Sequence, residues 1–243
     1  MESCSVEMIS VIIPTLEEER YIGKTLANLI KFIPEIEIIV VDGGSKDKTV
    51  EIARRYTDKV FRITERGISK AKNLGAKYAQ GDILVFIDAD VAVRDDFLPK
   101  VTRIFQNPDV VGATCNIMPA QPKLFEFIYF SLLNLFIRFS IKAFLPKTKF
   151  KLGSRGEFFA VRKKEFLEIG GFNAKIACLE DFDITFRLFE FRKFEFTEDL
   201  VVFESMRRIR KLGLLKVLSV WTTEFLVYLM YGVPKSRVWE VVR

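Results

Sequence analysis

The sequence predicts an α/β fold built on a mostly parallel sheet with helices on both faces. Three observations lead to this prediction. Apolar runs of strand length alternate with segments of helical spacing through the first 90 residues. The run before Asp88 is apolar through its middle, which is typical of a strand covered on both faces. The chain has 243 residues, 49% of them hydrophobic, enough for one larger domain or a domain with an appendage.

The first two predicted elements are a strand and a helix. Residues 8–14, "MISVIIP", form a short apolar and β-branched run that ends at Pro14, as expected of a buried strand. Residues 17–33 carry apolar side chains at positions 22, 26, 29 and 30, the spacing of one helix face.

Three more strands and two more helices follow in alternation. Residues 35–44 form a strand ending in Asp-Gly-Gly, and residues 45–56 form a helix with Ser45 as its N-cap. Strands over 59–63 and 82–90 flank a helix over 68–80. In a doubly wound sheet ligands bind outside the carboxyl ends of the strands, where Asp42 and Asp88 lie.

Residues 123–147 differ in composition from the part before them, with six phenylalanines between positions 125 and 144. The segment is long enough to cross a bilayer, which takes about 20 residues. Three charged residues disfavour a simple lipid-exposed span: Glu126, Arg138 and Lys142. We expect an interfacial or partly embedded helix, and a helix that packs between domains is the alternative.

Residues 207–243 repeat this pattern, with a basic run, "RRIRK", before an apolar stretch that carries Trp221, Tyr228 and Tyr231. These aromatic types are enriched at membrane interfaces. We therefore predict a catalytic domain over 1–206, with a donor half to about 118 and an acceptor half from about 119. The basic, apolar helical segment from 207 to 243 is expected to associate with a membrane, or else to present a solvated basic run.

The composition restricts the partners and the catalytic mechanisms that the chain can have. The net charge of +6 favours an anionic partner such as a phosphate, a nucleotide, a membrane surface or a nucleic acid. No nucleic-acid motif appears, so nucleic acid is not expected. The chain has no histidine, which excludes Ser-His and Cys-His catalysis and histidine-bound metals. Its three cysteines form no CxxC pair, which fits a reducing compartment, and no secretory signal opens the chain. We expect a cytoplasmic protein, peripheral on the inner face of the cell membrane.

The "DAD" tripeptide at 88–90 is the clearest chemical feature. Two neighbouring carboxylates repel each other, and a divalent cation relieves that repulsion. Carboxylate oxygens suit Mg²⁺ or Mn²⁺, and such an ion can neutralise a diphosphate leaving group. The alternative is an ordinary polar turn. The tripeptide "GKT" at 23–25 lacks the glycine that a phosphate-binding P-loop needs and falls in a helical pattern.

Five segments in order resemble the GT-A family of inverting glycosyltransferases of the family 2 type, which use nucleotide-diphospho sugars. They are "SVIIPTLEEE" (10–19), "VVDGGSKDKT" (40–49), "GISKAKNLGAKYAQGDILVFIDAD" (67–90), "GEFFAVRKKEFLEIGGFN" (156–173) and "LEDFDITFRL" (179–188). The resemblance spans roughly residues 8–210. It implies the GT-A fold and transfer of a sugar from a UDP- or GDP-linked donor to an acceptor.

For the donor, the resemblance implies that Pro14, Thr15 and Glu18 line the nucleoside pocket. Asp42 would bind the base, with Ser45 nearby.

For the metal and diphosphate, the resemblance implies that Asp90 ligates Mg²⁺ or Mn²⁺. Asp88 and Ala89 would contact the nucleotide sugar, Asp88 on its ribose or sugar side, and Asp88 would share the metal. Arg207 and Arg208 match a segment that contacts the diphosphate in relatives.

On the acceptor side, the resemblance implies that Asp181 deprotonates an acceptor hydroxyl, with Glu180 beside it and Gly156 in the same region. A carboxylate suits this role in a chain without histidine. The Phe-rich and basic segments favour a lipid-linked or membrane-proximal acceptor. If that acceptor is a polyprenyl phosphate, its attacking oxygen is already anionic and needs no base.

Some positions depart from the family pattern. Gly43 stands where many relatives carry a second Asp. Lys72, which the resemblance places among the nucleotide-sugar ligands, stands where Arg is usual, which weakens a bidentate phosphate contact. The QxxRW motif of processive synthases is absent. A sugar-phosphate nucleotidyltransferase would need a basic, glycine-rich loop after the first strand, where this chain has "PTLEEER". A non-enzymatic membrane- or anion-binding protein is the other alternative.

Overall fold

The computed structural model describes residues 8–142, 153–232, 234 and 236. Cys4 and the ends of the predicted segments 123–147 and 207–243 lie outside the described residues. Within those residues one mixed sheet has eight strands: β1 (Ile9–Thr15), β2 (Ile36–Asp42), β3 (Val60–Arg62), β4 (Ile83–Ile87), β5 (Ala92–Val93), β6 (Val110–Pro119), β7 (Phe158–Arg162) and β8 (Lys193–Glu204).

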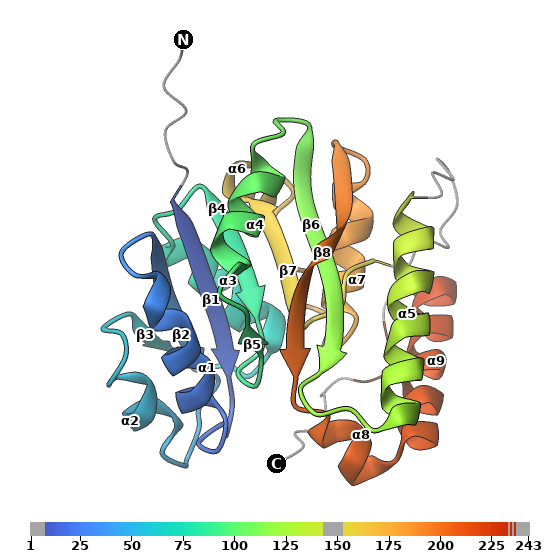
Figure 1. The fold of residues 1–243 in the computed structure, drawn as a ribbon, viewed down its shortest axis with the longest axis horizontal. Helices are drawn as coiled ribbons and strands as arrows, with labels where there is room; N and C mark the ends of the chain where they lie inside the picture. Colours follow the sequence, from blue (N-terminus) through green and yellow to red (C-terminus); the bar gives the residue numbers. More distant parts are fainter. Residues whose placement is uncertain (1–7, 143–152, 233, 235, 237–243) are drawn as a thin grey trace.

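The helices alternate with these strands along the chain (Figure 1). They are α1 (Ile22–Leu29), the 3₁₀ turn η1 (Ile30–Phe32), α2 (Thr49–Ala53), α3 (Ile68–Tyr78), α4 (Phe97–Phe105), α5 (Leu124–Lys142), α6 (Lys163–Glu168), α7 (Glu180–Leu188), α8 (Arg207–Leu212) and α9 (Leu214–Tyr231).

The strand order is β3-β2-β1-β4-β7-β6-β8-β5. The predicted parallel unit is confirmed, because β1, β2, β3 and β4 pair in parallel. Strand β7 then pairs antiparallel with both β4 and β6. This reversal brings the start of β7 to the same sheet edge as the carboxyl ends of β1, β2 and β4. Helices cover both faces of the sheet, as predicted.

Two apolar clusters form the core, one on each face. Helices α1 and α4 pack on one face, and α3, α6 and α7 pack on the other. The strand residues of β1 and β4 are almost wholly buried, which explains their apolar sequence. Helix α3 lies close to β1 at Gly75, where an added Cβ would overlap Ile12. This close packing fixes the position of the side chains of α3 above the sheet.

Two helix predictions differ from the structure. The predicted helix 17–33 begins at Ile22, because Glu17 has a left-handed backbone with φ of 60°, which a helix cannot contain. The backbone N–H groups of Glu17 and Glu18 donate to the side chains of Ser45 and Thr49, which hold this loop in place. The predicted helix 45–56 shortens to α2, and Ser45 is not its N-cap. The Ser45 hydroxyl instead accepts the hydrogen bond from Glu17, at 2.7 Å. A long-range contact between the two loops therefore replaces the local helical pattern.

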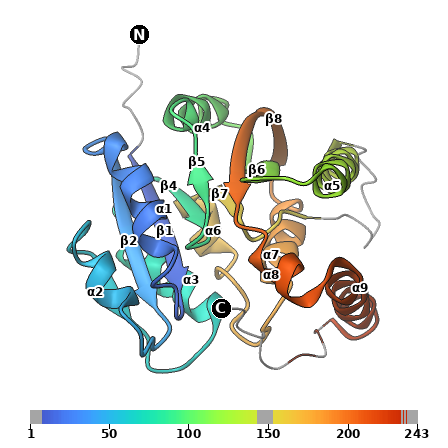
Figure 2. The ribbon, with the colours of Figure 1, turned by 60° about the horizontal axis from the view of Figure 1, so that its bottom comes forward.

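Helices α5 and α9 lie side by side at the end of the sheet away from β3 (Figures 1 and 2). Phe130 of α5 and Val217 of α9 belong to one buried apolar cluster, together with Met206 and Ile209. Among the described residues these two helices are long and apolar enough to cross a membrane, by length and composition alone.

Candidate active site

The predicted site residues lie at or near one edge of the sheet, and the side chain of Lys72 reaches this edge from the middle of α3. Strand β1 ends at Thr15, β2 ends at Asp42, and the turn after β4 carries Asp88 and Asp90. The loop before β7 carries Gly156, and α7 begins at Glu180. These segments meet because the carboxyl ends of parallel strands share an edge and β7 runs the opposite way.

At the β2 end, the fully buried Asp42 holds its own turn together. Its carboxylate accepts hydrogen bonds from the backbone N–H groups of Gly44 and Ser45, at 3.1 Å each, and pairs with the Arg62 Nε at 3.2 Å. A carboxylate has about four lone-pair positions, so acceptor capacity remains for a ligand.

At the β1 end, Pro14 and Thr15 lie beside this turn. The carbonyl of Thr15 accepts the Gly43 N–H at 2.7 Å. The buried Thr15 hydroxyl has no hydrogen-bond partner within the described residues. Buried polar atoms without partners carry a free-energy cost, so this hydroxyl is a candidate ligand contact.

In the DAD turn, Asp90 faces the basic segment that follows β8. Its Oδ2 lies 3.1 Å from the Arg207 Nε and also accepts a hydrogen bond from the Ser205 hydroxyl. The Arg207 guanidinium donates to both oxygens of Glu18, at 2.5 and 2.6 Å, and lies 4.8 Å from the centre of the Tyr21 ring. Arg207 therefore joins Glu18 and Asp90 across 117 to 189 residues of sequence.

Burial raises the pKa of two carboxyl groups in this region, those of Glu18 and Asp88. It raises the pKa of Glu18, although Arg207 opposes the shift. Burial also raises the pKa of Asp88 well above its usual value, more than the nearby Lys72 lowers it. Between the two aspartates, the Ala89 carbonyl accepts a hydrogen bond from Thr25 of α1 at 2.7 Å, which fixes the turn.

Asp88 and Asp90 are the candidate metal ligands. Within the described ranges, no group of three or more His, Cys, Asp or Glu residues is placed to hold a metal. Two carboxylates nevertheless fit Mg²⁺ or Mn²⁺, because such ions are commonly held by one or two carboxylates together with substrate phosphates and water.

At the start of α7, Glu180 and Asp181 surround a buried lysine. The Lys72 Nζ lies 2.6 Å from the Asp181 Oδ1 and 3.0 Å from the Glu180 Oε1. Burial, followed by the charge of Glu180, raises the pKa of Asp181 to about 7 against the opposing effect of Lys72. The positive end of the α7 dipole favours carboxylates in this first turn.

Gly156 approaches the other oxygen of the same carboxylate. A Cβ added at Gly156 would lie 2.8 Å from the Asp181 Oδ2, so any larger residue would press on that oxygen. The Ser154 hydroxyl, in the same loop, donates to the backbone carbonyl of Asp181 at 3.2 Å. The loop before β7 therefore positions both the backbone and the carboxylate of Asp181.

One cavity of about 430 Å³ opens onto these groups. Its polar end includes Asp88, Gly156, Glu180, Asp181 and Arg208. Its apolar end is formed by α5, α7 and α9, through Leu133, Ile137, Phe182, Leu218, Trp221 and Phe225. A second hollow of about 440 Å³ lies between β6 and α5 and contains none of the predicted site residues.

The sequence did not predict a cluster of three charged residues at this cavity, Arg155, Glu157 and Glu204. Arg155 and Glu157 line it, and the Arg155 Nη2 donates to Glu157 at 2.8 Å and to Glu204 at 2.6 Å. Burial raises the pKa of Glu204 well above its usual value. Glu157 directly follows the predicted Gly156, which was the signal available in the sequence; Glu204 gave none, because its link to Arg155 is tertiary.

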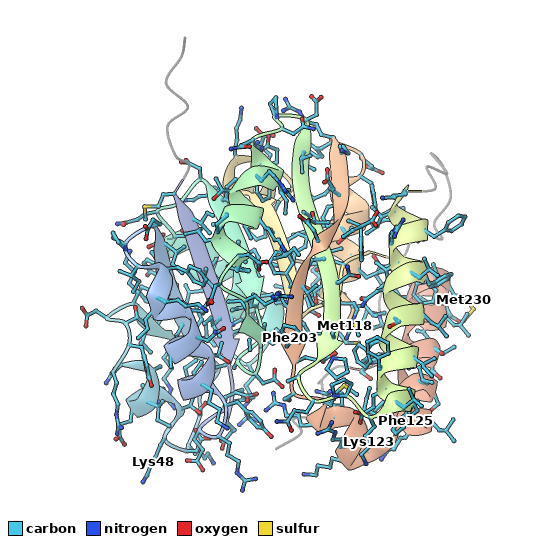
Figure 3. All side chains as sticks on the ribbon, viewed as in Figure 1. Lys48, Met118, Lys123, Phe125, Phe203 and Met230 are labelled. Carbon is cyan, nitrogen blue, oxygen red and sulfur yellow. The ribbon has the colours of Figure 1, made fainter. Side chains whose placement is uncertain are left out.

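Helices α5 and α9 expose apolar side chains and bury polar ones. On α5, Leu132 is 61% exposed and Phe136 is 57% exposed, whereas Glu126 and Asn134 are buried. Glu126 accepts hydrogen bonds from Arg210 at 3.1 and 3.2 Å, and the amide of Asn134 pairs with the backbone of β6. Figure 3 shows Met230 of α9 at the outer edge of the molecule and Phe125 at the lower end of α5, and both side chains are more than half exposed.

The model of a glycosyl transferase family, "Glycosyl transferase family 2", matches residues 10–170. This match covers more than half of the chain. The chain belongs to glycosyl transferase family 2. Its sheet and helices have the GT-A fold of the solved structures that resemble it, and the resemblance predicted from the five sequence segments is confirmed.

Curated relatives of this family 2 chain include two with named substrates. A 4,4'-diaponeurosporenoate glycosyltransferase of Staphylococcus haemolyticus is 40% identical over 102 residues, which is 39% of this chain and 27% of that protein. A dolichol-phosphate mannosyltransferase of Pyrococcus furiosus is 30% identical over 178 residues, 69% of this chain and 50% of that protein. The chain thus spans half or less of the length of these two relatives.

Among solved structures, a mannosyltransferase from Pyrobaculum calidifontis in complex with GDP-Man and Mn²⁺ has a TM-score of 0.65 at 22% identity. It covers 89% of this chain and 64% of its own. Glucosyl-3-phosphoglycerate synthase from Mycobacterium tuberculosis, with Mn²⁺, UDP-glucose and phosphoglyceric acid, has a TM-score of 0.66 at 18% identity and covers 95% of this chain and 82% of its own.

Proposed function

We propose that this chain is an inverting, metal-dependent glycosyltransferase. It would move a sugar from a UDP- or GDP-linked donor to a lipid-linked or membrane-proximal acceptor. The observation that carries the proposal is a single cavity that joins Asp88 and Asp181 to an apolar wall made by α5 and α9.

The donor end of the site supports a nucleotide-diphospho sugar. The strand ends at Thr15 and Asp42 offer an unpaired hydroxyl and a carboxylate with acceptor capacity for the nucleoside. Arg207 lies 3.1 Å from Asp90 and is therefore within reach of a diphosphate bound beside that carboxylate. Arg208, which lines the cavity, is the second cation that we assign to the diphosphate. Solved structures of this fold hold GDP-Man or UDP-glucose with Mn²⁺.

Asp90 and Asp88 would hold Mg²⁺ or Mn²⁺. When bound, the ion supplies positive charge to the diphosphate leaving group. Arg207, which lies 3.1 Å from Asp90 and stays positively charged, would add to the positive charge beside the same group.

Asp181 is the proposed general base, with Glu180 beside it. An inverting transfer needs a base that takes the acceptor proton on the face of the sugar opposite the leaving group. A carboxyl with a pKa of about 7 suits this role, since it is partly ionised near neutral pH and holds a proton well once it has taken it. Its Oδ2 faces Gly156, which lines the cavity.

The apolar half of the cavity supports an acceptor with a hydrocarbon part. Trp221 and Phe225 of α9 and Leu133 of α5 line this half, and the outer faces of the same helices are apolar. Water-exposed apolar patches of this kind mark membrane or partner contacts. Two relatives carry 4,4'-diaponeurosporenoate and dolichol phosphate in their names. We therefore place the protein at the inner face of the cell membrane, as a peripheral cytoplasmic enzyme.

A donor screen tests this function. The purified chain is incubated with UDP- and GDP-sugars, with Mn²⁺ or with EDTA, and release of the nucleoside diphosphate is measured. We expect metal-dependent release from one class of donor. Asp90→Ala should lower it by about 10²–10³-fold, whereas Asp95→Ala, at a side chain 95% exposed in the same loop region, should not. Undiminished release in Asp90→Ala, or release of pyrophosphate from a nucleoside triphosphate, would contradict the proposal.

A further inference from the structure

Lys72 was predicted to bind the donor, at a position where relatives carry Arg, but its surroundings in the structure do not fit that role. Its side chain projects from the middle of α3 and has no exposed surface. The Nζ contacts Asp181 and Glu180, at 2.6 and 3.0 Å, and lies 4.9 Å from the centre of the Phe172 ring. An ammonium enclosed on all sides cannot reach a diphosphate in the cavity without leaving these partners.

The two oxygens of Asp181 have different surroundings. Oδ1 accepts the hydrogen bond from Lys72, whereas Oδ2 faces Gly156, which lines the cavity and brings no side chain. Because the carboxylate is planar, the contact at Oδ1 fixes the direction of Oδ2. The chain therefore holds one oxygen by a buried cation and leaves the other toward the place where an acceptor would lie.

We propose that Lys72 is a positioning residue for Asp181, and not a ligand of the donor diphosphate. It orients the carboxylate and keeps it ionised for proton abstraction. This inference rests on the proposed function, because it takes Asp181 as the base.

Several charged groups act on Asp181 besides Lys72. Glu180 adjoins it on α7, and Asp88 approaches from the end of β4. Arg155, Glu157 and Arg208 line the same cavity. Burial and Glu180 favour the protonated carboxyl, and Lys72 is the cation that opposes them in direct contact. Removing its charge should therefore raise the pKa of Asp181 further and reduce the ionised fraction at neutral pH.

The test is the pH dependence of kcat/KM for transfer by the full chain, in Lys72→Met and in a matched control. Lys70→Met removes a lysine two residues away on the same helix, where it pairs with the exposed Glu65. We expect the acid limb of Lys72→Met to move to higher pH by roughly 1–3 units, with an unchanged Kd for the nucleotide sugar measured by calorimetry. Lys70→Met should leave both the acid limb and the Kd for the nucleotide sugar as they are in the wild type.

Glu180→Gln provides an opposite and isosteric change, which keeps the test valid if Lys72→Met does not fold. It removes a negative charge beside Asp181, so the acid limb should move to lower pH. A weakened donor Kd in Lys72→Met with an unmoved acid limb would assign Lys72 to the donor and overturn the inference. Unmoved limbs in both variants, in an enzyme that transfers sugar, would overturn it too. Failure of the wild type to turn over any nucleotide sugar would instead overturn the proposed function.

Discussion

Helix α1 buries its apolar side chains, whereas α5 exposes many of its own. In α1, Ile22, Leu26 and Leu29 are fully buried against β1 and its neighbours. In α5, Leu132, Leu135 and Phe136 are more than half exposed, whereas Glu126 and Asn134 are buried against the protein. The apolar face of α1 therefore stabilises the fold, whereas the outer face of α5 is available for a partner.

The donor half and the wall made by α5 and α9 also differ in what they present to a ligand. Carboxylates of the donor half, such as Asp42 and Asp90, already have protein partners in this state. The wall instead combines buried polar anchors, Glu126 to Arg210 and Asn134 to β6, with an apolar exterior. Asp181 lies where the two regions meet, in the cavity that both line.

The largest effect is expected at this meeting point. Asp181→Asn should lower transfer by about 10²–10⁴-fold, because the variant cannot accept a proton. If the rate stays within the range of the wild type, the acceptor oxygen is already anionic and the base is not needed, as expected for a phosphate acceptor.

The difference in stability between Asp181→Asn and the wild type should also depend on pH. Burial raises the pKa of Asp181 to about 7 in the folded chain, so its contribution to stability is full below its ordinary pKa of 3.8 and is lost as pH rises to about 7. Above pH 7 the wild type carries the cost of a buried charge that the variant lacks. Thermal unfolding should show Asp181→Asn with the higher Tm at pH 8, and the gap should close as pH falls toward 4.

A pair of leucine substitutions addresses the comparison of α1 and α5 directly. Leu26→Ala should lower the free energy of unfolding by about 2–5 kcal/mol, because it leaves a cavity in the core. Leu132→Ala, at a side chain 61% exposed, should change it by no more than about 0.5 kcal/mol. Chemical denaturation measures both. Equal losses would show that the face of α5 is part of the core in solution.

The smallest expected effect concerns membrane binding. Leu132→Glu places a charge on the outer face of α5, and co-sedimentation with anionic vesicles should weaken by about tenfold or more, given roughly 1.5–3 kcal/mol for a buried leucine. Leu167→Glu is the control, because Leu167 is 55% exposed on α6 and lies outside the wall. Equal loss in both variants would mean that charge alone, and not the α5 face, controls binding.

The parallel unit could be predicted from the sequence, because its strands follow a local pattern of apolar, β-branched runs with acidic residues after them. Strands β1 to β4 and the positions of Asp42, Asp88 and Asp90 at their ends follow from it. The helix 17–33 was predicted too long, because Glu17 has a left-handed backbone, in a loop that Ser45 and Thr49 hold from 28 to 31 residues away. The place of Lys72 was not predictable either, since its partner Asp181 is 109 residues distant.

The apolar character of α5 and α9 was also visible in the sequence, but the direction of their faces was not. That direction depends on tertiary partners, such as Arg210 for Glu126, 84 residues away. The proposed membrane contact and the acceptor site therefore rest on the structure more than the donor site does.

Sugar transfer to lipid in the presence of vesicles tests the central claim most directly. The chain is incubated with vesicles made from total membrane lipid, a radiolabelled nucleotide sugar and Mn²⁺, and the label is followed into the organic phase. We expect organic-phase label that disappears with EDTA and falls in Leu132→Glu but not in Leu167→Glu. Label that appears at the same rate on a water-soluble acceptor without vesicles would contradict the central claim.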